Sequence, residues 1–323
     1  MIRRKIRKMR RRLAAMLSRR LDKPLPPPTQ EEQELVNRLR GELDASCGLS
    51  GHPETCETAW SENIRQLCRN VKDADPRAFL RWEVIQRTMA VTHAEYIPHE
   101  LRFLRRRRDW AHRWAPALQE DRFGHPLPYW RHPTSSGNLI HHAYHCASFE
   151  EAMGRRVDDF GTIVEFGGGY GGMCRLIHRL GFRGRYVIFD LPAFSALQRF
   201  FLAGIGLAVS DHPIAGVASG VVECLSDLGL LSEVCQTDDR PSRLFLATWS
   251  LSETPLPLRE RLQPCWPRFD GFLIAYQSVF QGIDNVAFFT TMRDTLGGGT
   301  WREHRMTHMR NDNRYLFGLR GDC

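Results

Sequence analysis

Long hydrophobic segments are missing from this chain of 323 residues. No apolar run reaches the roughly 18 residues that a membrane-spanning helix needs, and no segment has the apolar core of a secretory signal peptide. The nine cysteines are odd in number, irregularly spaced and without a Cys-x-x-Cys pair. These absences argue against a membrane protein, a disulfide-rich domain and a zinc module, and they predict a reduced, cytoplasmic protein.

Acidic residues are almost absent from the first 23 positions. This segment holds eleven Lys/Arg against one acid, Asp22, for a charge of +10; since the whole chain carries +8, the other 300 residues carry −2. Six apolar residues recur there at helical spacing: Ile2, Ile6, Met9, Leu13, Met16 and Leu21. This pattern predicts that residues 1–23 form a basic amphipathic helix. We expect this helix to make peripheral contact with an anionic inner membrane surface. A solvated tail, a targeting peptide and a nucleic-acid arm are the alternatives, although we expect no specific nucleic-acid partner.

Glycine is concentrated in one place. An apolar run, Thr162–Phe166, is followed by five glycines within Gly167–Gly172, then by a helical run, and then by a second apolar run that ends at Asp190. A strand–loop–helix–strand unit with an acid at the tip of its second strand is the arrangement that binds an adenosine-type cofactor. Glycines let the backbone approach a ligand closely, and the helix N-terminus that follows favours an anion.

Two cofactor classes fit this motif. Gly167-x-Gly169-x-x-Gly172 matches the dinucleotide fingerprint, whereas Glu165-x-Gly167-x-Gly169-x-Gly171 matches the first motif of class I S-adenosylmethionine (SAM) methyltransferases. The acid Glu165 before the glycines and the segment Phe189-Asp190-Leu191-Pro192, which resembles the second motif of small-molecule O-methyltransferases, favour SAM. An NAD(P)-dependent oxidoreductase is the alternative. The residues expected to bind SAM are Glu165, Gly167, Gly168, Gly169, Tyr170, Gly171, Asp190 and Leu191, joined by Trp249 and Ser250 further along the chain.

Strand and helix patterns continue on both sides of this unit. Strands are expected at Arg243–Thr248 and Gly271–Tyr276, with Gly206–Ser210 and Val221–Leu225 as competing third strands, and a closing hairpin at Trp301–Thr307 and Arg314–Leu319. Helices are expected at about 29–45, 57–72, 76–120, Ala193–Leu202 and Ile283–Leu296, with a loop at Phe123–Ser136. This pattern predicts an α/β fold: the Rossmann-like sheet of class I methyltransferases, ending in an antiparallel hairpin and preceded by a helical region.

Three parts are expected along the chain. Residues 1–30 form the basic tail and a proline-rich linker, residues 31–150 a helical region that caps the substrate site, and residues 151–323 the SAM-binding domain.

Several segments together resemble a bacterial family of sugar O-methyltransferases. They are His141–Glu150, Ile163–Arg175, Tyr186–Pro192, Ala247–Pro255, Phe272–Gln277 and Asn313–Gly318. The resemblance implies SAM as cofactor and a hydroxyl of a sugar as acceptor, in a polysaccharide, a glycolipid or a glycosylated metabolite. A methyltransferase acting on a non-sugar small molecule is the alternative.

Methyl transfer to a hydroxyl benefits from a positioned base. The preferred candidate is His145, with His141 beside it, in what we expect to be a linker before the first strand of the sheet. Glu253 is the second candidate, either as the base or as the group that orients it, because it follows the strand Arg243–Thr248, whose carboxyl end should face the cofactor. No acid completes a metal site with these histidines, so no metal is expected. Gln277, Asn313 and Tyr315 are candidates to bind hydroxyls of the acceptor.

Overall fold

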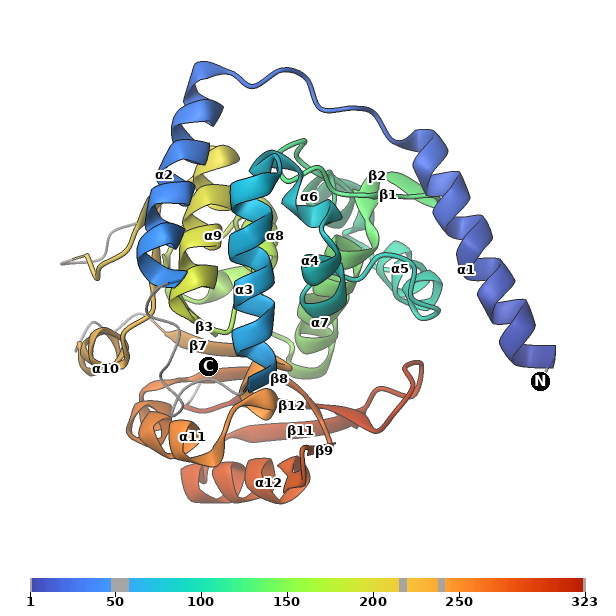
Figure 1. Ribbon diagram of the computed structural model, residues 1–323. Coiled ribbons are helices and arrows are strands. Elements are labelled where there is room, and N and C mark those ends of the chain that lie inside the picture. The colour runs from blue at the N-terminus through green and yellow to red at the C-terminus, as the bar shows by residue number, and fades with distance from the viewer. Residues whose placement is uncertain (1, 48–57, 215–219, 238–241, 322–323) are drawn as a thin grey trace.

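The computed structural model describes residues 2–47, 58–214, 220–237 and 242–321. An eight-stranded sheet with the order β11-β12-β8-β7-β3-β4-β6-β5 lies at its centre (Figure 1). The strands are β3 (Thr162–Phe166), β4 (Arg185–Phe189), β5 (Ala208–Ser210), β6 (Val221–Leu225), β7 (Arg243–Thr248), β8 (Gly271–Gln277), β11 (Thr300–Arg305) and β12 (Asn313–Leu319). Strands β3 to β8 pair in parallel, whereas β12 pairs antiparallel with both β8 and β11. The predicted fold class is confirmed.

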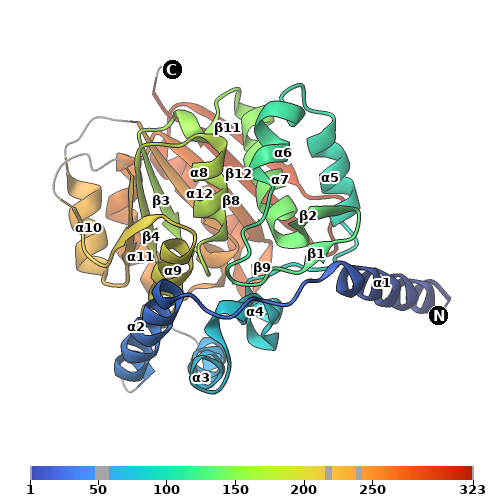
Figure 2. The ribbon, with the colours of Figure 1, turned by 90° about the horizontal axis from the view of Figure 1, so that it is seen from above.

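Helices cover both faces of the sheet (Figure 2). One face carries α7 (Gly137–Met153), α8 (Gly172–Leu180) and α9 (Pro192–Gly204), and the other carries α10 (Leu228–Gln236), α11 (Leu256–Leu262) and α12 (Asn285–Leu296). Because successive strand residues point to opposite faces, Ile163 and Ile188 join the first core, whereas Val164 and Val187 join the second. This burial on both faces explains why the strands read as continuous apolar runs.

The N-terminal helices are α1 (Ile2–Leu21), α2 (Gln30–Cys47) and α3 (Thr58–Asp73). A capping box is present at the start of α2: the Glu32 N–H donates to Thr29 Oγ1 at 3.1 Å, and the Thr29 N–H donates to Glu32 Oε2 at 3.0 Å. Helix α2 packs along α9 (Figure 1), so this N-terminal segment is attached to the sheet domain.

The prediction of a largely helical segment over 76–120 is wrong in detail. The segment consists of short pieces: a 3₁₀ turn (Pro76–Arg81), α4 (Glu83–Thr88), α5 (Ile97–Arg105), a π-helical turn (Trp110–Trp114) and α6 (Ala115–Ala117). Three of these pieces have a proline at their first or second position, where it is tolerated because no N–H is needed there. Each proline therefore begins a new turn instead of continuing the preceding helix.

Other short elements also differ from expectation. The predicted loop Phe123–Ser136 contains a hairpin of β1 (Pro128–Tyr129) and β2 (His132–Ser136), and a second small hairpin, β9 (Val279–Phe280) with β10 (Ile283–Asp284), precedes α12. The two competing third strands are both strands: β6 lies beside β4, and β5 lies at the edge. The remaining 3₁₀ turns are Val157–Asp159, Ser250–Glu253 and Gln263–Arg268.

Cysteine 68 is disulfide-bonded, so the prediction of a fully reduced chain is wrong at this residue. Spacing along the sequence did not reveal this bond, because it depends on which side chains the fold brings together. Within the described ranges, no helix combines the length and the apolar character needed to cross a bilayer. The division of the chain at residues 30 and 150 stays a prediction.

Candidate active site

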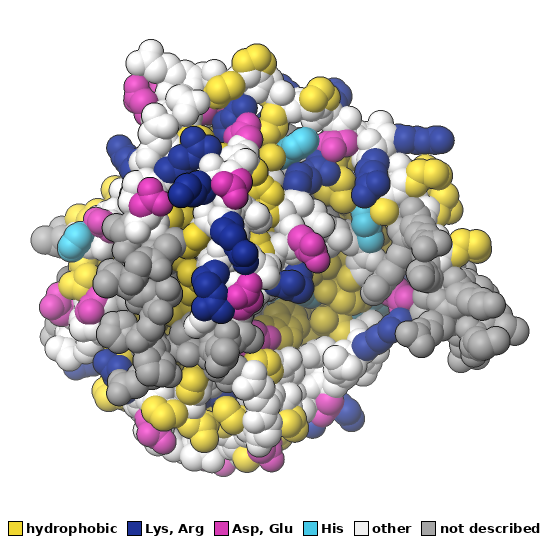
Figure 3. Space-filling view, viewed as in Figure 1, with side chains coloured by type: hydrophobic (Ala, Val, Ile, Leu, Met, Phe, Trp, Pro, Cys, Tyr) yellow, Lys and Arg dark blue, Asp and Glu magenta, His cyan; other side chains and the backbone are white. Residues whose placement is uncertain are grey.

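A pocket of about 840 Å³ opens at the carboxyl ends of the central strands. Its wall contains the glycine loop after β3, Asp190 after β4, Trp249 after β7 and, on the opposite side, the face of α7 that carries His141 and His145. Figure 3 shows the hollow near the centre of the view, with hydrophobic side chains at its opening. The carboxyl edge of a parallel sheet is where ligands bind in this class of fold, so the pocket lies where the sequence predicted it.

The glycine loop has the backbone geometry that only glycine adopts without strain. Gly167, Gly169 and Gly171 have φ values of +70°, +59° and +90°. A side chain at Gly167 would also place its Cβ 2.2 Å from the Cβ of Ser250. The loop therefore passes close to the segment after β7, and the space above it stays open. Gly171 itself is not in the pocket wall; it caps α8 from behind the loop, next to Leu202.

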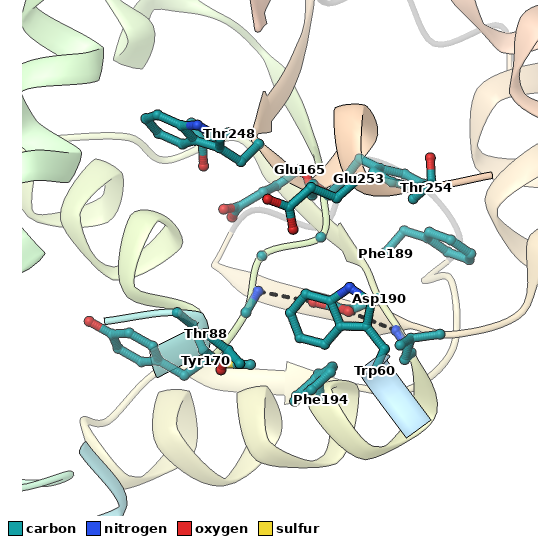
Figure 4. Close-up of a pocket in the computed structure, with 18 of the residues that line it drawn as sticks. Trp60, Thr88, Glu165, Tyr170, Phe189, Asp190, Phe194, Thr248, Glu253 and Thr254 are labelled. Carbon is teal, nitrogen blue, oxygen red and sulfur yellow. Dashed lines mark hydrogen bonds between the residues drawn. The ribbon is translucent and has the colours of Figure 1, made fainter. Parts of the chain in front are cut away.

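Asp190 holds this loop in place (Figure 4). Its Oδ2 accepts hydrogen bonds from the Gly169 N–H at 2.9 Å and from Gln198 Nε2 at 3.0 Å, and its Oδ1 accepts one from the Leu191 N–H at 2.8 Å. Burial raises the pKa of Asp190 to about 7, although these hydrogen bonds oppose the shift. The carboxyl group thus joins the two halves of the strand–loop–helix–strand unit and also faces the pocket.

Glu165 lies beneath the loop at the end of β3. Its side chain is buried, and its Oε2 accepts a hydrogen bond from the Tyr186 hydroxyl at 2.8 Å. Burial raises the pKa of Glu165 to about 8, so this carboxyl group keeps its proton near neutral pH. Two acids with raised pKa values therefore lie under and beside the same glycine loop.

Glu165→Gln should change how stability depends on pH. The unfolded chain loses this proton near pH 4.5 and the folded chain near pH 8, so the contribution of Glu165 to folding is complete below pH 4.5 and is lost as the pH rises to 8. The loss is at most about 1.4 kcal/mol per pH unit. Glutamine does not titrate and can still accept from Tyr186. In urea unfolding, the variant should therefore gain stability relative to wild type as the pH rises. An unchanged difference across this range, or the same trend for the exposed Glu260→Gln, would contradict the assignment.

Three further residues that we predicted to bind the cofactor line the pocket, and two of them already have hydrogen-bond partners within the protein. The Tyr170 hydroxyl accepts a hydrogen bond from Asn138 Nδ2 at 2.8 Å, and the Ser250 hydroxyl donates to the Phe166 carbonyl. Leu191 lies in the wall beside Asp190. Tyr170 and Ser250 therefore shape the cofactor end of the pocket, and their hydroxyl groups already have partners.

His141 and His145 lie in a helix and not in the linker that we predicted. Helix α7 begins at Gly137, where the Ser136 hydroxyl accepts from the Leu139 N–H at 3.1 Å. Because His141 and His145 are four residues apart, both project from one face of α7, with Nε2 atoms 3.2 Å apart. His145 Nδ1 lies 2.5 Å from the Tyr315 hydroxyl. Both ring nitrogens of His145 are thus occupied, and its burial holds its pKa well below the usual value.

A buried carboxylate connects these two histidines to a third, which the sequence did not reveal. Glu100 Oε1, on α5, lies 2.9 Å from His141 Nδ1 and 3.2 Å from His308 Nε2. Burial alone would raise the pKa of Glu100, but the two histidines outweigh it and lower that pKa below its usual value. A continuous chain of hydrogen bonds therefore runs from Tyr315 through His145, His141 and Glu100 to His308.

His308 is the member of this chain with a ring nitrogen to spare. It lies in the pocket wall between β11 and β12, its ring stacks on His99 with centroids 4.7 Å apart, and its Nδ1 has no hydrogen-bond partner within the described residues. No sequence motif marks Glu100 or His308, because they are 208 positions apart. Within the same ranges, no three His, Cys, Asp or Glu side chains form a metal-binding group.

Trp249 separates the two ends of the pocket. Its backbone has φ +63°, an uncommon value for a bulky residue, and its ring packs 5.4 Å from His141 and 5.1 Å from His145. Its Nε1 lies 3.5 Å from Asn313 Oδ1. Glu253 (Figure 4) is also in the wall, where its Oε1 accepts from Gln277 Nε2 at 3.2 Å. Of the predicted catalytic and acceptor-binding residues, all but Tyr315 line this one pocket; Tyr315 contacts His145 but is not in the wall.

Comparison with known proteins adds little to this geometry. No protein-family model and no curated protein matches the sequence. Similar solved structures include the N-terminal domain of EvdMO1 in the presence of SAH and D-fucose (12% identity, TM-score 0.40, 71% of this chain and 100% of that chain) and PigF with SAH (13%, 0.36, 92% and 100%). EvdMO1 itself is 14% identical with a TM-score of 0.39 over 55% of this chain, which spans 41% of its length. Because these TM-scores lie below 0.5, no conclusion about function depends on them.

Proposed function

We propose that this chain is a SAM-dependent O-methyltransferase whose acceptor is a sugar hydroxyl. The observation that supports this most is the continuous pocket, with a glycine loop and two acids at one end and a histidine–carboxylate chain at the other. A cofactor with an adenosine part, a charged sulfur and an amino-acid part needs these groups in close succession. An acceptor hydroxyl then needs a proton acceptor at the far end.

The residues at the glycine end fit SAM in charge and shape. A Cβ at Gly167 would collide with Ser250, and one at Gly168 would lie 2.6 Å from Ile188 Cγ2, so only glycine lets the loop lie this close to the strands and leave the pocket its present shape. Asp190 would accept from the ribose hydroxyls, and the N-terminus of α8 would favour the methionine carboxylate. When bound, the cofactor supplies the activated methyl group and its sulfur leaving group.

His308 is the proton acceptor in this proposal. The carboxylate of Glu100 holds Nε2–H and so leaves the lone pair on Nδ1, which is the way a carboxylate orients an imidazole base in hydrolytic triads. His145, the base predicted from the sequence, has both nitrogens in use and acts here as a positioning residue with His141. Glu253 stays a candidate for binding the acceptor, together with Gln277 and Asn313.

A sugar acceptor is supported by the polar groups that line this end of the pocket. The amide side chains of Gln277 and Asn313 and the carboxylate of Glu253 offer both donors and acceptors, and Trp249 offers a flat apolar surface beside them. A non-sugar small molecule is the alternative. Transfer of a labelled methyl group from SAM into cell extracts, followed by hydrolysis to monosaccharides, should place the label on a sugar. If the label stays with a non-sugar part of the molecule after hydrolysis, the acceptor is a non-sugar small molecule instead.

Ligand-dependent thermal stability tests the cofactor. S-adenosylhomocysteine at about 100 times its Kd should stabilise the folded state by about 2.7 kcal/mol and raise the Tm by a few degrees. NADH at the same concentration should leave the Tm unchanged. Stabilisation by NADH without stabilisation by S-adenosylhomocysteine would overturn the proposal in favour of an oxidoreductase.

A further inference from the structure

Helix α1 carries most of the exposed large hydrophobic side chains of the described chain. Met9, Leu13, Met16 and Leu21 are 66%, 51%, 45% and 42% exposed, and only Leu256 and Val279 elsewhere are comparably exposed. The helix runs over Ile2–Leu21 and projects from one side of the molecule (Figures 1 and 2). Four exposed apolar side chains on one helix form a surface that water covers unfavourably.

The apolar side chains of α1 point away from the rest of the protein, whereas packing against the protein would bury them. Ser18 is fully buried, whereas Met9, Leu13 and Met16 are exposed. At 3.6 residues per turn, the three apolar residues fall within about 60° of one another and Ser18 falls on the opposite side. The helix thus turns a serine toward the body of the protein and its apolar stripe outward. A surface helix that only completes its own core does the opposite.

Asp22 fixes this orientation at the end of the helix. Its Oδ1 accepts from Arg81 Nη2 at 2.6 Å and lies 3.0 Å from His125 Nε2. A few residues further on, Arg77 Nη1 donates to the Pro26 carbonyl at 3.0 Å. Arg81 and Arg77 belong to the 3₁₀ turn Pro76–Arg81, so the connection between α1 and α2 is held by the folded body. The outward stripe is therefore presented at a defined angle.

The charge of the helix identifies its partner. Residues 1–23 contain eleven Lys/Arg and one acid, and the exposed Arg19 and Arg20 line the same shallow hollow as Met16. An apolar stripe on a strongly basic helix matches the boundary between acyl chains and anionic headgroups. A nucleic acid would use the basic residues but would gain nothing from the outward Met9, Leu13 and Met16.

We propose that α1 lies in the plane of an anionic lipid surface, with Met9, Leu13 and Met16 inserted among the lipids. The pocket is not formed by this helix, so the proposal is independent of the reaction. The folded body is held at the membrane while the pocket stays open to acceptors from the aqueous side or from the lipid surface.

Vesicle binding by the full-length protein tests the proposal. Phosphatidylcholine vesicles containing phosphatidylglycerol should bind the protein, and pure phosphatidylcholine vesicles should bind it much more weakly. The triple variant Met9→Ser, Leu13→Ser, Met16→Ser keeps every charge, and its affinity for the anionic vesicles should fall by about tenfold or more, because less apolar area is buried. The matched control Leu256→Ser, Val279→Ser removes exposed apolar side chains elsewhere and should bind as wild type does.

Three outcomes would overturn the proposal. The first is no binding of the wild type to anionic vesicles, and the second is equal binding by the triple variant and the wild type. The third is that the protein binds RNA more tightly than anionic vesicles and that the triple variant changes neither affinity. That result would identify nucleic acid as the partner of the helix. S-adenosylhomocysteine binding by the triple variant should equal that of the wild type, so a folding failure would be recognised.

Discussion

Replacing Asp190 by alanine should weaken S-adenosylhomocysteine binding by about 10- to 100-fold. The substitution removes the acceptor proposed for the ribose hydroxyls, and a hydrogen bond to a charged group contributes about 1.5–3 kcal/mol. It also removes the acceptor of the Gly169 N–H and one acceptor of Gln198 Nε2, so fewer hydrogen bonds hold the glycine loop, although the Gly167 N–H still donates to the Phe189 carbonyl of β4. Calorimetric titration above pH 7 is the appropriate measurement, because burial raises the pKa of Asp190 to about 7 and the carboxylate is fully charged only above that value.

Two comparison variants separate the loss of the Asp190 carboxylate from a general effect on the protein. Asp211→Ala removes an exposed acid after β5 and should leave the affinity unchanged. Gln198→Ala keeps the carboxylate but removes one of its supports, and should reduce the affinity less than Asp190→Ala does. Unchanged affinity in a folded Asp190→Ala protein would place the ribose contact elsewhere and would remove the main argument for the orientation of the cofactor.

His308→Ala should lower the rate of methyl transfer by about 10²- to 10⁴-fold, the usual contribution of a positioned base. Affinity for S-adenosylhomocysteine should change little, because His308 belongs to the end of the pocket away from the glycine loop. The rate of label transfer from SAM to the extract fraction that accepts it, measured with cofactor in excess, would report kcat without a contribution from cofactor binding.

The split between kcat and KM separates a base from a residue that only shapes the pocket. His308→Ala should lower kcat with little change in the KM for the acceptor, because a base acts in the transition state. Glu100→Gln should reduce the rate as well, since the amide orients Nε2–H less strongly than the carboxylate. His304→Ala, an exposed histidine on the same hairpin, is the matched control and should behave as wild type. Full activity in His308→Ala would return the role of base to His145 or Glu253.

The glycine-loop half of the candidate site could be located from the sequence because its residues are close together in the chain. Glu165, the glycines and Asp190 lie within 26 consecutive positions, and each has a chemical reason that a pattern can express: positive φ, an acid at a strand end, a helix N-terminus. The strands could also be predicted, because burial on both faces makes each strand a short, continuous apolar run in the sequence. Arg243–Thr248 was predicted with the same bounds as β7.

The acceptor half could not be predicted in the same way. Glu100 and His308 are an isolated acid and an isolated histidine in the sequence, and only tertiary packing places both beside His141. The segment around His141 was taken as a linker because its histidines obscure the amphipathic pattern; α7 is buried along most of its length and has little polar face to reveal it. The short helices of 76–120 could not be predicted, because a proline in the sequence is compatible with either a kink in one helix or the first turn of a new one.

The order in which the chain is made has a consequence for this pocket. The hydrogen bonds of the glycine loop connect residues at most 32 positions apart, whereas the His145–Tyr315 and Glu100–His308 contacts close loops of 170 and 208 residues. Strand β12, which carries Tyr315, must insert between β8 and β11 before the histidine chain is complete. Contacts between distant residues form late because closing a long loop costs entropy. A chain emerging from the ribosome is therefore able to form the hydrogen bonds within the glycine loop well before those of the histidine–carboxylate chain, which must wait for the last strand.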